Sequence, residues 1–124
     1  MKERNFTRDN LIDVSNIREE LRDFPSTLYS YLENKSDLEA SYESSKANYE
    51  MVRSQVYIEV KSTTEKVTEA AAEARINTDP RVLSAQDRMF KLKRDFETLK
   101  NYTESLRAKK DMLVQISADL RKEQ

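Results

Sequence analysis

The sequence predicts an all-α protein, because it has no glycine, only two prolines, and leucines that recur every seven residues near its end. An average chain carries about 7% glycine. Glycine is the usual residue of left-handed turns and of backbone that approaches a ligand closely, so its absence favours long helices with few corners. Leucines at seven-residue intervals are typical of helices that pair as coiled coils.

The composition indicates that these helices stabilise one another by pairing rather than around one large core. Charged residues make up 36% of the 124 residues, and apolar residues including tyrosine make up 37%. Typical domains are roughly 45–50% apolar, and the mean hydropathy here is −0.88. The length fits a single helical domain over residues 1–124.

The first predicted element is an N-terminal helix within residues 1–25. We expect this helix to end at Pro25, because the residue before a proline is pushed out of the helical region. Ser26 can then cap the next helix with its hydroxyl group.

The second predicted element is a long helix over residues 26–79. Ser62-Thr63-Thr64-Glu65 matches the capping-box pattern S-x-x-E, so this segment is either one helix bent near residue 62 or two helices in series. Its aromatic and apolar residues recur at helical spacing and predict a surface that packs against another helix, with base stacking as the alternative role of its tyrosines. This surface consists of Tyr31, Leu38, Tyr42, Tyr49, Val52 and Val56.

The third predicted element is a basic heptad helix over residues 80–124. Asp79 provides an N-cap acceptor directly before Pro80, whose missing N–H costs nothing in the first helical position. At about 1.5 Å per residue this helix spans roughly 60 Å, which implies an extended antiparallel hairpin or an oligomeric bundle. Heptad position d is leucine throughout, and position a becomes polar late in the helix, at Thr103, Lys110 and Ser117. The residues expected to pair helices are Tyr31, Leu38, Tyr42, Tyr49, Leu92, Phe96, Leu99, Leu106 and Leu113.

Charge is distributed unevenly along the chain. Residues 1–80 hold 11 Lys and Arg against 16 Asp and Glu, whereas residues 81–124 hold 11 against 7. In the third helix Lys93, Lys100 and Arg107 share heptad position e, beside the helix-pairing surface. These cations form salt bridges to a neighbouring helix, or simply face solvent, or follow a phosphate backbone.

The residues that are missing argue against an enzyme. Without histidine or cysteine, acid–base work would need buried carboxylates, Lys or Tyr, and the acidic residues occur in exposed-looking runs. We therefore expect no catalytic residue, metal or cofactor. No stretch approaches the roughly 18 apolar residues of a membrane span, and no signal peptide is evident, so we expect a cytoplasmic protein without a membrane partner.

Part of the chain resembles a known family. The residues that carry the resemblance are Lys66-Val67-Thr68-Glu69-Ala70, Arg75-Ile76-Asn77-Thr78-Asp79-Pro80-Arg81-Val82 and the upstream Leu28-Tyr29-Ser30-Tyr31-Leu32-Glu33-Asn34-Lys35. With the leucine-spaced helix that follows, they are similar to the UvsY-type recombination mediator proteins of tailed bacteriophages. The resemblance covers roughly residues 26–120.

The resemblance implies an all-helical protein that forms ring-like homo-oligomers in the host cell cytoplasm. Such proteins bind single-stranded DNA and help to load a RecA-like recombinase in place of a single-strand binding protein. Their DNA-binding motif corresponds here to residues 51–61, which keep only Arg53 and Lys61 as basic residues. Because this motif is weakly basic here, Lys66 and the cations of the third helix are candidates as well. The candidate DNA contacts are Arg53, Lys61, Lys66, Lys91, Lys93, Arg94, Lys100 and Arg107.

A second class of function stays open. A structural or adaptor coiled coil, such as a helical hairpin of a chaperone-like or virion assembly protein, would have the same architecture without binding nucleic acid.

Overall fold

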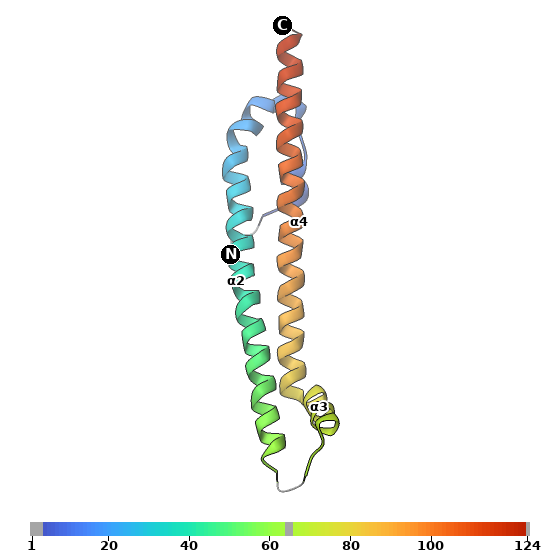
Figure 1. Cartoon of the computed structure of the whole chain (residues 1–124). Coiled ribbons are helices and arrows are strands. Elements are labelled where there is room, and N and C mark those ends of the chain that lie inside the picture. Colours follow the sequence, from blue (N-terminus) through green and yellow to red (C-terminus); the bar gives the residue numbers. More distant parts are fainter. Residues whose placement is uncertain (1–3, 64–65, 124) are drawn as a thin grey trace. The chain divides into compact units, whose positions relative to one another are not determined.

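The computed structural model describes residues 4–63 and 66–123 and confirms the all-α prediction. Its elements in chain order are α1 (Phe6–Asn10), the 3-10 helix η1 (Val14–Asn16), α2 (Ile17–Lys61), α3 (Glu69–Thr78) and α4 (Pro80–Lys122), as Figure 1 shows. The described residues contain no strand. The chain divides into two compact units, one from residues 1–37 and 97–124 and the other from residues 38–96. In each unit a segment of α2 pairs with an antiparallel segment of α4, so the predicted helical hairpin is confirmed.

The core of the first unit is built from buried side chains of α2 and α4. Ile17, Phe24 and Tyr31 of α2 lie against Leu106 and Leu113 of α4. Partly buried apolar residues surround them, namely Phe6, Ile12, Leu21, Leu28, Leu99, Tyr102 and Ile116.

The predicted end of the first helix at Pro25 is wrong, because α2 begins at Ile17 and continues through this proline. Ile17, Phe24 and Tyr31 are spaced seven residues apart, so only a continuous helix brings all three into the same core. Burying such side chains contributes about 1.5–3 kcal/mol each, which together outweighs the roughly 3 kcal/mol that a proline costs inside a helix. Pro25 itself is exposed. Ser26 therefore lies within α2 and caps no helix.

Residues 4–16, here called the N-terminal arm, form the short N-terminal helix and η1. Asn5 caps α1 by accepting a hydrogen bond from the amide of Arg8 at 3.0 Å. The ring of Phe6 stacks on that of Tyr102, with centroids 3.9 Å apart, and meets Tyr31 edge to face at 6.1 Å. The arm thus packs against both α2 and α4 of the first unit.

In the second unit the segment after residue 61 forms a separate helix. Helix α2 ends at Lys61 and α3 begins at Glu69, where the hydroxyl of Thr68 accepts a hydrogen bond from the amide of Ala71 at 3.1 Å. Of the two alternatives for residues 26–79, two helices in series is therefore correct. The capping box predicted at residues 62–65 includes Thr64 and Glu65, which lie outside the described residues.

The predicted start of α4 is confirmed. The carboxylate of Asp79 accepts a hydrogen bond from the amide of Arg81 at 2.8 Å, and Pro80 is the first helical residue. The guanidinium of Arg81 also contacts Glu59 of α2 at 2.6 Å, which joins the start of α4 to the end of α2. A small core of Val56, Ile76 and Val82 fills the space beside this junction.

The residues predicted to pair helices are all buried or half-buried. Tyr31, Leu106 and Leu113 are buried, and the rings of Tyr42 and Phe96 lie 6.4 Å apart. The half-buried members are Leu38, Tyr42, Tyr49, Leu92, Phe96 and Leu99.

Late in α4 the buried surface departs from the predicted heptad register. Lys110 is exposed and its neighbour Lys109 is buried instead, because the N-terminal arm covers the adjoining side of the helix. Leu120 is exposed as well. Within the described part of the chain, no helix is long and apolar enough to cross a membrane.

Candidate nucleic-acid interface

The basic candidates for DNA contacts fall into two groups, those that form ion pairs and those that form none in the described chain. Arg53 and Lys61, both candidates for DNA contacts, belong to the first group. Arg53 bonds to Glu73 at 3.0 Å and to Asn77 at 2.9 Å, and Lys61 contacts Glu69 at 2.6 Å. These contacts hold α3 against α2, so both side chains already have a structural role.

The contacts of Lys61 also shift the pKa of its partner. The Lys61 ammonium holds the pKa of the Glu69 carboxyl below its usual value by hydrogen bonding and by charge attraction. The same pairing raises the pKa of Lys61. Both groups are therefore charged near neutral pH, and each satisfies the other.

The candidates on α4 belong to the second group. Lys91, Lys93, Arg94, Lys100 and Arg107 are all exposed. Across residues 4–63 and 66–123 none of these five side chains forms an ion pair or a hydrogen bond. We call them the α4 basic series. No salt bridge from these cations to a neighbouring helix is formed within the described chain, which leaves solvation and phosphate binding as the two interpretations.

Acidic residues of α4 itself lie three or four positions from each member of the series, some before it and some after it. The pairs Lys93 with Glu97 and Lys100 with Glu104 have the spacing of helix ion pairs, but neither pair is formed in the structure. A cation placed before the anion is the less favourable order for such a pair on a helix. These carboxylates moderate the positive potential of α4 without neutralising individual cations.

Lys66 is the remaining candidate. It is exposed and precedes α3 in the chain, on the segment between α2 and α3. Of the five candidates on α4, Lys91, Lys93 and Arg94 belong to the second unit, and Lys100 and Arg107 belong to the first. The other three candidates belong to the second unit as well, outside α4.

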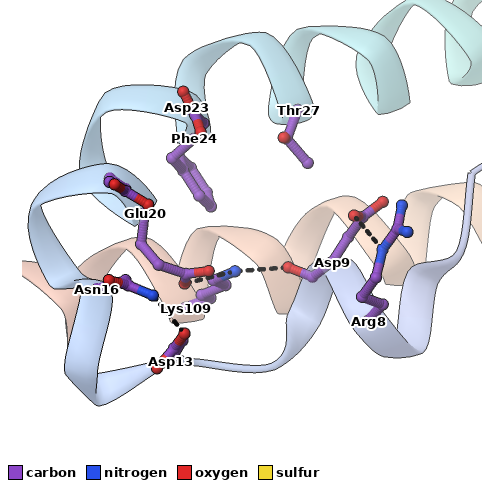
Figure 2. A pocket seen from close by; sticks show the side chains of 10 residues that line it. Arg8, Asp9, Asp13, Asn16, Glu20, Asp23, Phe24, Thr27 and Lys109 are labelled. Carbon is purple, nitrogen blue, oxygen red and sulfur yellow. Dashed lines mark hydrogen bonds and ion pairs between the residues drawn. The ribbon is translucent and has the colours of Figure 1, made fainter.

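Lys109 is the one basic residue of α4 that is buried, with 8% of its side chain exposed. Its ammonium donates a hydrogen bond to the backbone carbonyl of Asp9 at 2.6 Å and lies 3.0 Å from Oε2 of Glu20 (Figure 2). The contact with Glu20 is an ion pair, although its angles do not meet those of a hydrogen bond. The sequence gives no signal that distinguishes Lys109 from Lys110, since both follow Leu106 at a spacing that shares its helix face.

The space around Lys109 is a cavity of about 300 Å³ between the arm, α2 and α4. Carboxylates make up half of its lining residues, and Figure 2 shows Glu20 and Asp13 on the side of the lysine. Because these groups repel anions, the cavity does not suit a phosphate. The contacts of Lys109 attach the N-terminal arm to α2 and α4. Among the described residues, no group of three or more acidic side chains is placed to hold a metal ion.

Tyr31 adds a second polar attachment of the arm. Its hydroxyl donates a hydrogen bond to the carboxylate of Asp9 at 2.8 Å. Burial of the phenol, together with the adjacent carboxylate, raises the pKa of Tyr31 to about 12. Asp9 in turn accepts a hydrogen bond from Arg4 at 3.1 Å.

Comparisons of the chain with protein-family models, with curated proteins and with solved structures found no match.

Proposed function

We propose that this protein binds single-stranded DNA as a homo-oligomer and acts as a recombination mediator, without catalytic activity of its own. The observation that carries the proposal is the α4 basic series, five exposed cations that form no ion pair among the described residues. Arg4, Arg53, Lys61, Arg81 and Lys109, in contrast, all form ion pairs. Unpaired cations are the groups that can neutralise phosphates and release counter-ions from DNA.

The charge of the whole chain indicates weak binding by each subunit. The formal net charge is −1, so long-range attraction to DNA is small and the favourable contacts are confined to α4. A homo-oligomer would bring several such surfaces to one strand and convert weak contacts into avidity. This arrangement suits a mediator, which holds a strand for a RecA-like recombinase and then gives it up.

The proposed recombination role rests on the resemblance at residues 66–82. A direct test is the ATPase activity of a RecA-like recombinase on single-stranded DNA that is covered by single-strand binding protein. We expect the protein to shorten the lag before ATP hydrolysis. No change in the lag, in conditions where the protein binds DNA, would contradict the mediator role while leaving DNA binding intact.

DNA binding itself is tested by a salt titration with a fluorescent oligothymidine. For single strands the logarithm of the binding constant falls with the logarithm of salt by about 0.7 per phosphate contact, so about three to five contacts give a slope between −2 and −3.5. Phosphate contacts are strong at low salt, about 50 mM. We expect the triple variant Lys93→Glu, Lys100→Glu, Arg107→Glu to show no binding even there. No binding of the wild type under these conditions, or binding without salt dependence, would overturn the proposal.

A matched control separates the α4 basic series from net charge. The triple variant Arg18→Glu, Lys46→Glu, Arg75→Glu makes the same change in charge at exposed positions on α2 and α3. We expect it to retain most of the DNA affinity. Equal losses in both triple variants would mean that α4 has no special part in binding.

Exposed apolar side chains favour the second candidate, a structural or adaptor coiled coil. Leu83, Met112 and Val114 of α4 are all exposed and offer surface for another protein or another copy. Sedimentation of the α4 triple variant with and without DNA distinguishes the two candidates. Loss of oligomers in a protein whose wild type never binds DNA would support the structural role.

A further inference from the structure

Phe90 stands apart from the other phenylalanines of the chain. Its side chain on α4 is 48% exposed. Phe24 is buried, Phe6 stacks on Tyr102, and Phe96 lies against Tyr42. A single exposed apolar residue is common on protein surfaces, so exposure alone assigns no role to this ring.

The neighbours of Phe90 on the helix surface supply the second observation. Residues three and four positions apart are adjacent on a helix, which places Lys93 and Arg94 on one side of Phe90 and Gln86 and Asp87 on the other. Phe90, Lys93 and Arg94 all belong to the second unit, and both cations are exposed members of the α4 basic series. The surface therefore combines an accessible aromatic face with two cations that form no ion pair in the described chain, although the carboxylate of Glu97 follows them on the same helix.

This combination fits one kind of ligand better than another protein helix. A partner helix would cover Phe90 but would also have to supply anions for Lys93 and Arg94. Single-stranded nucleic acid offers both complements at once, since each unstacked base has a π-face and each nucleotide carries a phosphate. In a duplex the base faces are already stacked, so the ring would contribute nothing there.

We infer that Phe90, Lys93 and Arg94 form a subsite for one nucleotide of single-stranded DNA. The ring of Phe90 stacks on the base, and the two cations hold the phosphates that flank it. This inference rests on the proposed function and deepens it, because it divides binding into a base-dependent part at Phe90 and a phosphate-dependent part at the basic residues.

The test compares two oligonucleotides of equal length, an oligothymidine and the same backbone made of abasic sites. Removing a base-stacking ring weakens binding by about tenfold. Phe90→Ala should therefore lose about tenfold affinity for the oligothymidine and none for the abasic strand. Lys93→Ala should weaken binding of both strands alike, because it removes a phosphate contact.

Tyr29→Ala is the matched control. Tyr29 is an aromatic residue of α2 that is 66% exposed, and its neighbours three and four positions on are Leu32 and Glu33 rather than cations. We expect this variant to bind both strands as the wild type does. An equal loss of oligothymidine binding in Tyr29→Ala and Phe90→Ala would overturn the assignment of the subsite.

The chain has no tryptophan, so Phe90→Trp would place a single fluorescent indole at the subsite. We expect its emission to be quenched by the oligothymidine and to stay unchanged with the abasic strand. Unchanged emission while the oligothymidine binds would overturn the inference. The inference would also be overturned if Phe90→Ala changed the mass of the oligomer but still preferred the oligothymidine over the abasic strand as the wild type does. If the wild type binds neither strand, the proposed function fails as a whole, which is a different result from these.

Discussion

Lys109 and Lys110 are adjacent in the sequence and occupy opposite environments. The heptad pattern places Lys110 at a position that faces the partner helix, whereas the structure exposes it and buries Lys109. The pattern considers two helices only, but the N-terminal arm forms a third surface against α4. A lysine can bury its methylene groups there and direct its ammonium to acceptors. Which of two neighbouring lysines is buried could not be predicted without knowing where the arm lies.

The two lysines give a matched pair of variants for stability. Lys109→Ala leaves Glu20 and the carbonyl of Asp9 without their cation, and an unsatisfied partner of this kind costs about 1–3 kcal/mol. Lys110→Ala changes an exposed side chain and should alter stability by less than about 0.5 kcal/mol. Urea unfolding followed by circular dichroism measures both. Equal midpoints for the two variants would show that the contacts of Lys109 contribute no net stability.

At the scale of elements, local signals were reliable and signals that compete with the core were not. The start of α4 depends on Asp79 and Pro80 alone, and it was predicted from the sequence. The continuation of α2 through Pro25 depends on packing against Leu106 and Leu113, far away in the sequence, so the local proline rule failed. The N-cap of α3 at Thr68 lacks the glutamate that completes a capping box. The capping-box pattern therefore predicts a helix start at residues 62–65 and not at Thr68.

Pro25 therefore lowers the local stability of α2. Pro25→Ala restores an amide that can donate to the carbonyl of Leu21, and alanine is favoured over proline by about 3 kcal/mol in a helix interior. The gain is reduced by about 1 kcal/mol because proline also restricts the unfolded chain. We expect the variant to be more stable by about 2 kcal/mol, measured as a higher midpoint in thermal or urea unfolding.

Ser26→Ala is the control for Pro25→Ala, because it changes the next helical residue without restoring a hydrogen bond. Its effect should stay within about 0.5 kcal/mol. A destabilised Pro25→Ala protein would indicate that the proline shapes α2 in a way that the core requires.

At the scale of the whole molecule, the all-α class and the helical hairpin followed from composition and periodicity. Two features did not. The sequence left open whether the leucines of α4 pair within one chain or between chains, and the structure shows pairing within one chain, around separate cores in the two units. The sequence also left open whether the cations of α4 are satisfied by other residues, because ion pairs depend on side-chain positions that periodicity does not specify.

The stability of the whole molecule should have a plateau at intermediate pH and fall on both sides. On the acid side, Arg81 lowers the pKa of Glu59 and of Asp79 through hydrogen bonds. Groups with a lowered folded pKa stabilise the protein above their unfolded values, here 4.5 and 3.8, and this stabilisation is lost as the pH falls through the folded values. On the alkaline side, Tyr31 has a folded pKa of about 12 against 10.0 unfolded, so its stabilisation is complete below pH 10.0 and is lost as the pH rises to about 12.

Unfolding free energies measured across this pH range test both the acid and the alkaline loss of stability. Tyr31→Phe should remove part of the loss of stability at alkaline pH, and Glu59→Gln should remove part of the loss of stability at acid pH. If each variant shows the same pH profile as the wild type, the two groups do not couple to folding as the structure indicates.

The backbone has a practical consequence for experiments on this chain. No residue in 4–63 or 66–123 has a positive φ angle, and the sequence contains no glycine. Alanine can therefore adopt the native backbone conformation at every described position, and within helices it is the most favoured residue. A complete alanine scan would consequently report side-chain roles with little interference from backbone strain. Positions where alanine weakens DNA binding without lowering stability would map the interface directly.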